Sequence, residues 1–120
     1  MWYIKDAEAS RSSFKKLNKN HQKEYVACFV NLDKILTVLN SGSKIGGFKV
    51  GFFRSEGSGL YRIGQTGVKA SKEVRLYVYP ESEDEIMYIL SIGTKETQKN
   101  DINEAKRKIK KIKGPKKENI

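Results

Sequence analysis

Apolar residues recur along the chain with two different periods, and together these periods predict an α+β domain. The clearest strand pattern covers residues 73–79, where Val74, Leu76 and Val78 alternate with polar or aromatic residues. A period of two is typical of a strand with one face in a core. Residues 86–92 (IMYILSI) are nearly all apolar, which predicts a central strand covered on both faces.

The segments next to these strands predict a hairpin and a C-terminal helix. Residues 80–84 (PESED) contain a proline, which cannot continue a central strand, so we interpret them as the hairpin connection. Residues 93–99 form a polar loop, and Asn100 and Asp101 can cap the helix that follows. That helix is amphipathic, with apolar residues at helical spacing: Ile102, Ala105, Ile109 and Ile112.

The N-terminal part predicts one strand and two helices. Residues 2–4 (WYI) are a short apolar run typical of an edge strand, and residues 6–17 contain a short helix with Phe14 and Leu17 on one face. Asn20 can cap a second helix. The second helix has the strongest apolar stripe of the chain, formed by Tyr25, Cys28, Phe29, Leu32, Ile35, Leu36 and Leu39. It is therefore the expected packing partner of the sheet.

The middle of the chain predicts further short strands. Residues 46–51 are rich in glycine, and Phe48, Val50 and Phe52 alternate, which fits a strand or an ordered loop. A turn, a short strand and a loop then follow at residues 54–59, 60–63 and 64–72. This order of elements predicts a small antiparallel sheet packed against two N-terminal helices, with a basic helix at the C-terminus.

Composition narrows the class of protein. A chain of 120 residues can build one modest core, so we expect residues 1–113 to form a single domain and residues 114–120 a disordered tail. The net charge of +10 points to a polyanionic partner. One cysteine cannot form an internal disulfide. No apolar run is long enough to span a bilayer and no secretory segment follows Met1, so we expect no membrane and a cytoplasmic location.

Common catalytic patterns are missing. The single histidine and the single cysteine cannot make a zinc site. His21 lies far in sequence from the basic strands and is expected to be a structural surface residue, whereas Cys28 falls on the apolar stripe and is expected in the core. The acidic residues between 81 and 85 are interpreted as a solvated hairpin tip. Residues 42–51 lack the Gly-x-x-x-x-Gly-Lys-Ser/Thr pattern of a phosphate-binding loop.

What remains is a set of cations on adjacent predicted strands. The alternation places Arg62 and Arg75 opposite the apolar rows, and Lys95 follows the central strand. An ordinary solvent-exposed face would have the same pattern. The functional interpretation is a phosphate-binding surface with aromatic rings available to stack on bases.

Three segments resemble the RelE/ParE superfamily of bacterial and archaeal toxins, in its RelE/HigB-like part. They are LYRIG, VRLYVY and YILSIGTKETQKNDINEAKRKI, and the resemblance covers about residues 60–112, with a weaker match to the two preceding helices. The ending LLxxxxKxTQKxxxxEIxxAKxR recurs in HigB-like members, and residues 97–99 and 105–107 follow it. The resemblance implies a small α+β fold, cleavage of mRNA, usually on the ribosome, and neutralisation by a cognate antitoxin protein.

The resemblance also implies roles for single residues. The family's Tyr-Lys-Ile-Lys strand aligns with residues 61–64, which gives Arg62 the position of a site cation. Its Tyr-Arg-Leu strand gives the same position to Arg75, and its Ser-Val-Gly-Lys-Arg-Glu turn places a further site cation at Lys95. The catalytic tyrosine of the family's last helix has no counterpart near Asp101. The histidine that some HigB-like toxins carry on the final strand is replaced by Ser91.

The implied reaction is attack by a ribose 2′-hydroxyl on the adjacent phosphate, giving a 2′,3′-cyclic product without a metal or other cofactor. Arg62 and Arg75 would hold the phosphate, and Lys95 would stabilise the leaving or equatorial oxygens or accept the 2′-hydroxyl proton. Further RNA contacts are assigned to Lys69, Lys72, Tyr77, Gln98 and Lys99. Two alternatives stay open: a ParE-like poison of DNA gyrase, and a non-catalytic RNA-binding module.

Overall fold

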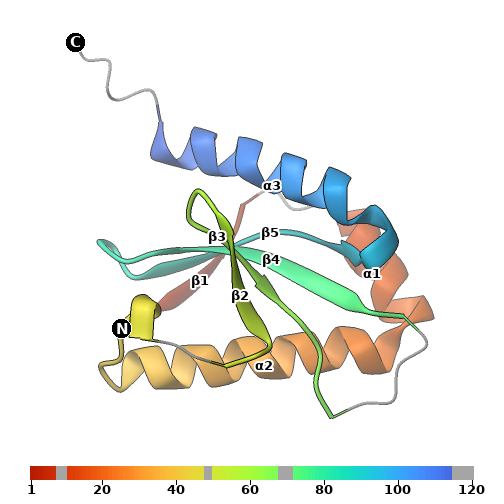
Figure 1. Cartoon of the computed structure of the whole chain (residues 1–120), viewed down its shortest axis with the longest axis horizontal. Helices are drawn as coiled ribbons and strands as arrows, with labels where there is room; N and C mark the ends of the chain where they lie inside the picture. Colours follow the sequence, from red (N-terminus) through yellow and green to blue (C-terminus); the bar gives the residue numbers. More distant parts are fainter. Residues whose placement is uncertain (8–10, 48–49, 68–71, 115–120) are drawn as a thin grey trace.

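A five-stranded sheet separates two layers of helices (Figure 1). The computed structural model describes residues 1–7, 11–47, 50–67 and 72–114. In chain order the elements are β1 (Tyr3–Asp6), α1 (Arg11–Asn20), α2 (Gln22–Asn40), a 3-10 turn (Ile45–Gly47), β2 (Phe53–Gly57), β3 (Leu60–Ile63), β4 (Val74–Glu81), β5 (Ile86–Thr94), a second 3-10 turn (Lys95–Thr97) and α3 (Gln98–Lys113).

The sheet has the strand order β1-β5-β4-β3-β2. Strands β2 to β5 pair antiparallel with their neighbours in the chain, and β1 pairs parallel with β5. The predicted α+β class is confirmed, with one parallel edge strand added to an otherwise antiparallel sheet. β5 lies between β1 and β4, as the continuous apolar run predicted.

The first core lies between the sheet and the helices α1 and α2. It contains the predicted stripe of α2, of which Cys28, Leu32, Ile35, Leu36 and Leu39 are buried. Fully burying each large member of such a stripe stabilises the fold by roughly 1.5–3 kcal/mol before chain entropy is subtracted. Cys28 is 0% exposed, as expected for a core residue. Burial raises the pKa of its thiol to about 12.

The second core lies on the opposite face, beneath α3 (Figure 1). Its buried members are Leu60, Tyr77, Leu90, Ala105 and Ile109. The amphipathic pattern of the last helix is therefore confirmed. The β4 side chains that alternate with Val74, Leu76 and Val78 were expected to face solvent. The helix α3 covers one of them, Tyr77.

Pro80 lies inside β4, so the prediction that the strand ends before it is wrong. It pairs with Met87 of β5. On the other side of β4 the register with β3 reaches only from Leu76 to Val78. Because Pro80 lies beyond β3, its missing N–H removes no hydrogen bond to that strand.

The turn predicted at residues 54–59 is shorter in the structure. Residues 53–57 form β2, and only the Gly57-Ser58-Gly59 segment reverses the chain, with positive φ at all three residues. Positive φ favours glycine, which occupies two of these positions. Val50 and Phe52 precede β2, and Phe48 lies outside the described residues.

Both predicted helix caps are displaced. Asn20 is the last residue of α1, and His21 is the N-cap of α2. α3 begins at Gln98 rather than after Asn100, because a 3-10 turn carries the chain directly into it. Asp101 therefore lies in the first turn of α3 and accepts a hydrogen bond of 2.6 Å from the Thr97 hydroxyl.

The C-terminal prediction is tested only in part. α3 ends with Gly114 as its C-cap, whereas residues 115–120 of the predicted disordered tail fall outside the described residues. Within the described ranges, no helix combines the length and the apolar character needed to cross a bilayer.

Candidate nucleic-acid interface

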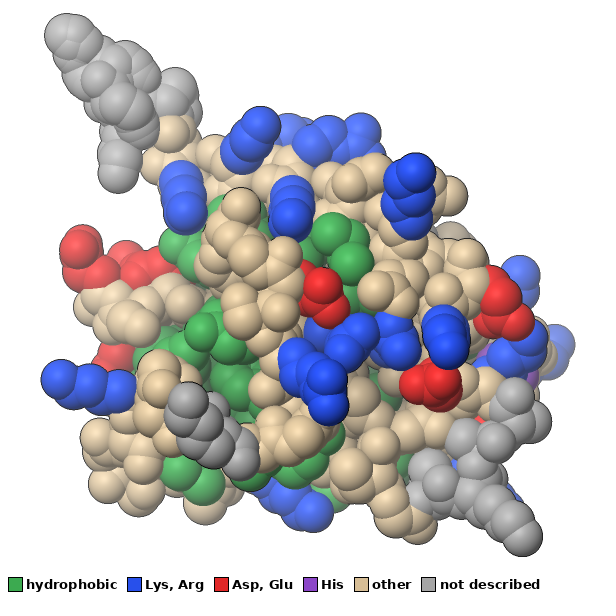
Figure 2. All heavy atoms as spheres, viewed as in Figure 1, with side chains coloured by type: hydrophobic (Ala, Val, Ile, Leu, Met, Phe, Trp, Pro, Cys, Tyr) green, Lys and Arg blue, Asp and Glu red, His purple; other side chains and the backbone are tan. Residues whose placement is uncertain are grey.

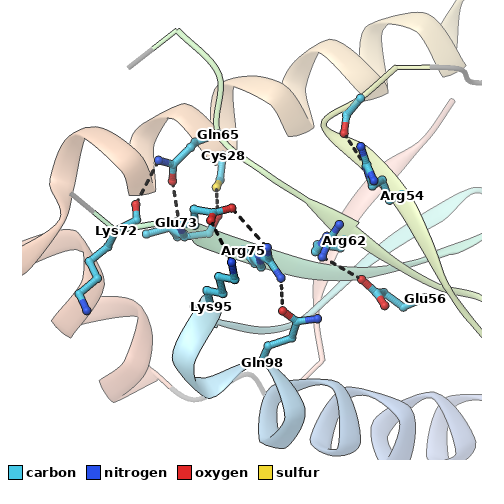
Figure 3. A network of polar contacts seen from close by, with 12 residues as sticks. Cys28, Arg54, Glu56, Arg62, Gln65, Lys72, Glu73, Arg75, Lys95 and Gln98 are labelled. Atoms are coloured by element: carbon cyan, nitrogen blue, oxygen red, sulfur yellow. Dashed lines mark hydrogen bonds and ion pairs between the residues drawn. The ribbon is translucent and has the colours of Figure 1, made fainter. Parts of the chain in front are cut away.

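An arginine groove of about 460 Å³ lies on the sheet face that α3 partly covers. Arg54, Arg62 and Arg75 line it, one from each of β2, β3 and β4. Figure 2 shows Lys and Arg side chains gathered near the middle of the view, below α3, with acidic side chains beside them. Figure 3 shows Arg54, Arg62 and Arg75 following one another across the strands. The groove thus concentrates three positive charges contributed by adjacent strands.

The strand register explains why the three arginines share a face. Arg54 pairs with Arg62 across β2 and β3, and Arg62 pairs with Tyr77 across β3 and β4. Arg75 lies two residues from Tyr77 along β4 and therefore on the same face. Like charges directly opposite one another in a sheet are destabilising. The Glu56 carboxylate, 3.3 Å from Arg62, offsets part of the repulsion between Arg54 and Arg62.

Arg54 was missed from the sequence because residues 54–59 were interpreted as a turn. The glycines on both sides of Ser58 indicate a tighter turn. A tight turn at that point brings residue 54 opposite residue 62. This spacing could have identified the third arginine.

The arginines are held by neighbouring polar groups. Arg62 forms an ion pair of 3.3 Å with Glu56, and both side chains are 19% exposed. Arg75 donates from Nη1 to the Gln98 side-chain oxygen and from Nη2 to Glu73 at 3.3 Å. Arg54 donates from Nε to the Gly51 carbonyl at 3.1 Å. The guanidinium groups are therefore oriented before any ligand binds.

Lys95 lies at the edge of this arrangement rather than in the groove. Its ammonium is 3.9 Å from the second carboxylate oxygen of Glu73, and its side chain is 68% exposed. Glu73 therefore connects Lys95 to Arg75 (Figure 3). The three predicted catalytic cations are close in space, with Arg62 and Arg75 in the groove and Lys95 beside it.

The predicted RNA-contacting residues fall into different environments. Lys99 is exposed, and Lys72 forms an ion pair with Glu96 that lowers the pKa of that carboxyl to about 2. Gln98 holds Arg75. Tyr77 is 0% exposed beneath α3, so the expectation of an accessible ring for base stacking is wrong. Lys69 lies outside the described residues.

Buried polar side chains fix the loop that forms one wall of the groove. Asn31 of α2 is 1% exposed. Its amide donates to the Gly64 carbonyl at 2.8 Å and accepts from the Thr66 hydroxyl at 3.3 Å. Gln65 donates to the Lys72 carbonyl and accepts from the Val74 amide. Asn31 is a polar residue among the buried positions of α2. A polar residue at such a position can be noticed in the sequence, but the sequence does not show which groups it binds.

His21 is closer to the basic segment than its place in the sequence suggested. It lines a pocket of about 290 Å³ together with Lys72, Thr94 and Asp101. Burial raises the pKa of Asp101, and its hydrogen bond from Thr97 opposes that rise. His21 therefore lies near Lys72, one of the predicted RNA-contacting residues, but it does not line the arginine groove.

The chemistry of the arginine groove suits anions with several oxygens. Planar guanidinium groups bind phosphate with two hydrogen bonds each. Among the described residues, no three His, Cys, Asp or Glu side chains gather closely enough to hold a metal ion. Comparisons with protein-family models, curated proteins and solved structures find no match to this chain.

Proposed function

We propose that this protein is the toxin of a type II toxin–antitoxin system and acts as an mRNA interferase of the RelE/HigB-like kind. It cuts RNA through attack of a ribose 2′-hydroxyl on the adjacent phosphate, with the hydroxyl proton passing to solvent. The bond to the 5′-oxygen of the next nucleotide breaks, solvent protonates that oxygen, and the products end in a 2′,3′-cyclic phosphate and a 5′-hydroxyl. Its substrate is mRNA on the ribosome in the cytoplasm, and a cognate antitoxin neutralises it. The observation that carries the proposal is the arginine groove, where Arg62 and Arg75 occupy positions that the sequence resemblance assigns to phosphate binding.

The charge balance of the groove favours binding of a phosphate chain. The carboxylate partners of the cations are Glu56, Glu73 and Glu96, and the last two are 59% and 61% exposed. Exposed ion pairs are worth only about 0–1 kcal/mol each. An RNA phosphate, which offers several anionic oxygens in one rigid group, can therefore replace Glu73 and Glu96 at little cost. Displacing Glu56 costs more, because both side chains of its ion pair with Arg62 are only 19% exposed.

In the proposed mechanism, Arg62 and Arg75 bind the non-bridging oxygens of the scissile phosphate and hold it in line with the 2′-hydroxyl. Charge that develops in the transition state is stabilised by these groups and by Lys95. Each donor of this kind typically lowers the barrier by about 2.7–4 kcal/mol. Gln98 keeps the Arg75 guanidinium in place from the start of α3.

The test is cleavage of end-labelled RNA by the purified protein, with and without ribosomes and in the presence of chelator. We expect products ending in 2′,3′-cyclic phosphate and no cut at a position where the ribose is 2′-deoxy. Arg62→Ala and Arg75→Ala should each lower the rate about 100-fold or more. Arg107→Ala is the matched control, because it removes the same charge from the exposed side of α3, outside the groove.

Other outcomes would favour the alternatives. RNA binding without cleavage, on and off the ribosome, would favour a non-catalytic RNA-binding module. Inhibition of DNA gyrase with intact RNA would favour a ParE-like poison. In cells, we expect expression to arrest growth, co-expression of the antitoxin to restore it, and primer extension to reveal cuts within mRNA. Normal growth with abundant folded protein would contradict the toxin function.

A further inference from the structure

Tyr77 carries a buried hydroxyl for which the fold supplies no hydrogen bond. Its side chain is 0% exposed, and its oxygen is the one buried side-chain polar atom in the described ranges without a hydrogen-bond partner. Leaving a buried polar group unpaired costs roughly 1–3 kcal/mol. A phenylalanine would fill the same core without that cost. The hydroxyl is thus an unused hydrogen-bond donor, and its burial lowers the stability of the fold.

The two ends of the Tyr77 side chain have different surroundings. Its ring packs with Leu60, Leu90, Ala105 and Ile109 beneath α3. The hydroxyl lies within the electrostatic influence of the groove arginines and of nearby carboxylates. Arg62 is opposite Tyr77 in the sheet, and Arg75 is two residues along the same face.

The electrostatic balance keeps this hydroxyl protonated. Burial, followed by the charges of Asp101 and Glu56, raises its pKa to about 12, against the opposing effects of Arg75 and Arg62. At neutral pH the group is therefore a neutral donor beside two cations. A neutral donor that lies within the electrostatic influence of two cations is suited to an anionic acceptor.

We propose that the Tyr77 hydroxyl donates a hydrogen bond to the phosphate oxygen that Arg62 and Arg75 hold. This inference rests on the proposed function for the identity of the ligand as RNA. On binding, Arg62 exchanges Glu56 for the phosphate, Arg75 binds it while still held by Gln98, and one of the phosphate oxygens reaches the hydroxyl. Tyr77 then serves the site through its hydroxyl, while its ring remains part of the core.

The experiment compares Tyr77→Phe with Tyr79→Phe. Tyr79 lies two residues further along the same strand, with its ring stacked on Tyr88 at 5.9 Å between centroids. Two quantities are measured for each variant: the urea midpoint of unfolding, and the affinity for a 2′-O-methyl RNA that cannot be cut. Binding of inorganic pyrophosphate, followed by thermal shift, is the second probe.

We expect Tyr77→Phe to keep or raise the urea midpoint, because it removes an unpaired polar atom. The same variant should bind the uncleavable RNA and pyrophosphate about 10- to 100-fold more weakly, and Tyr79→Phe should bind like the parent protein. A lower midpoint in Tyr77→Phe would mean that the hydroxyl already has a partner in the free protein. Unchanged affinity for both probes, or no binding of either probe by the parent protein, would also overturn the inference.

The two proposals fail in distinguishable ways. Suppose that the parent protein binds RNA or pyrophosphate but cuts nothing, and that Tyr77→Phe weakens that binding. The proposed hydroxyl contact is then supported and the proposed nuclease activity is contradicted. If the parent protein cuts RNA and Tyr77→Phe binds and cuts it equally well, the proposed nuclease activity is supported and the proposed hydroxyl contact is contradicted.

Discussion

Arg75 donates a hydrogen bond to the side chain of Gln98, and this contact joins the middle of the sheet to the first residue of α3. Glu73 accepts from the other terminal nitrogen of the same guanidinium at 3.3 Å. The guanidinium is therefore fixed from two sides, by its own strand and by the helix that covers the strand. The position of α3 consequently helps to set where the Arg75 guanidinium lies in the arginine groove.

Substitutions of Gln98 test this dependence. Gln98→Ala frees one side of Arg75 and should lower RNA cleavage about tenfold, because hydrogen bonds to charged groups are worth about 1.5–3 kcal/mol. Gln98→Glu should lower RNA affinity further, because the new carboxylate competes with phosphate for Arg75. Thermal unfolding should change little in both variants. Cleavage by Gln98→Glu at the parent rate would contradict the assigned role of Gln98.

Gly93 is the point where β5 meets the start of α3. A Cβ at this position would lie 1.8 Å from the Asp101 carboxylate and 2.4 Å from the Thr97 hydroxyl. Gly93→Ala should therefore destabilise the protein by about 1–3 kcal/mol or more, as overpacked sites do. Urea unfolding measures the effect. Gly46→Ala is the control, because a Cβ at residue 46 would meet no atom within 4 Å, and equal stability losses in both variants would contradict the explanation.

Asn31 should be needed for both stability and the groove wall. Asn31→Ala leaves the Gly64 carbonyl and the Thr66 hydroxyl without their buried partner. We expect a loss of about 1–3 kcal/mol in unfolding free energy and weaker RNA binding. Thr66→Val removes only one of the two hydrogen bonds and should have the smaller effect on stability. The reverse order of the two variants would show that Asn31 does not hold the loop.

The raised pKa of Tyr77 predicts a loss of stability in alkali. In the unfolded chain the phenol ionises near 10, whereas in the folded protein it does so at about 12. Between these values the folded state binds more protons, so its stability falls as pH rises, by up to about 1.4 kcal/mol per pH unit. Urea unfolding between about pH 9.5 and 11.5 should therefore show a shallower decline for Tyr77→Phe. Parallel curves for the two proteins would contradict the shift.

Periodicity predicted the parts of this fold that depend on neighbours in the chain. The stripe of α2, the bounds of β3 and the shared face of Arg62 and Arg75 all follow from spacing. Alternation shows which side of a strand a residue occupies but not what covers that side. For this reason Tyr77 was expected at the surface, although α3 buries it.

Other features depend on contacts between distant segments. Arg54 joins the groove only because a tight glycine turn sets the register of β2 and β3. Asn31 meets the loop after β3 through tertiary packing, which leaves no pattern in the sequence. The resemblance seen in the sequence supplied the proposed roles of Arg62, Arg75 and Lys95, which spacing alone leaves equivalent to an ordinary charged face.

The cover that α3 provides has a consequence for the time at which activity arises during synthesis. β2, β3 and β4 contain all three arginines, yet Gln98 and the helix that encloses Tyr77 are translated after them. β1 must likewise wait for β5, its parallel partner, because contacts between distant segments form late in folding. A nascent chain should therefore be inert until α3 has left the ribosome. Under the proposed function, an antitoxin already present in the cell would meet the protein at the moment it becomes active.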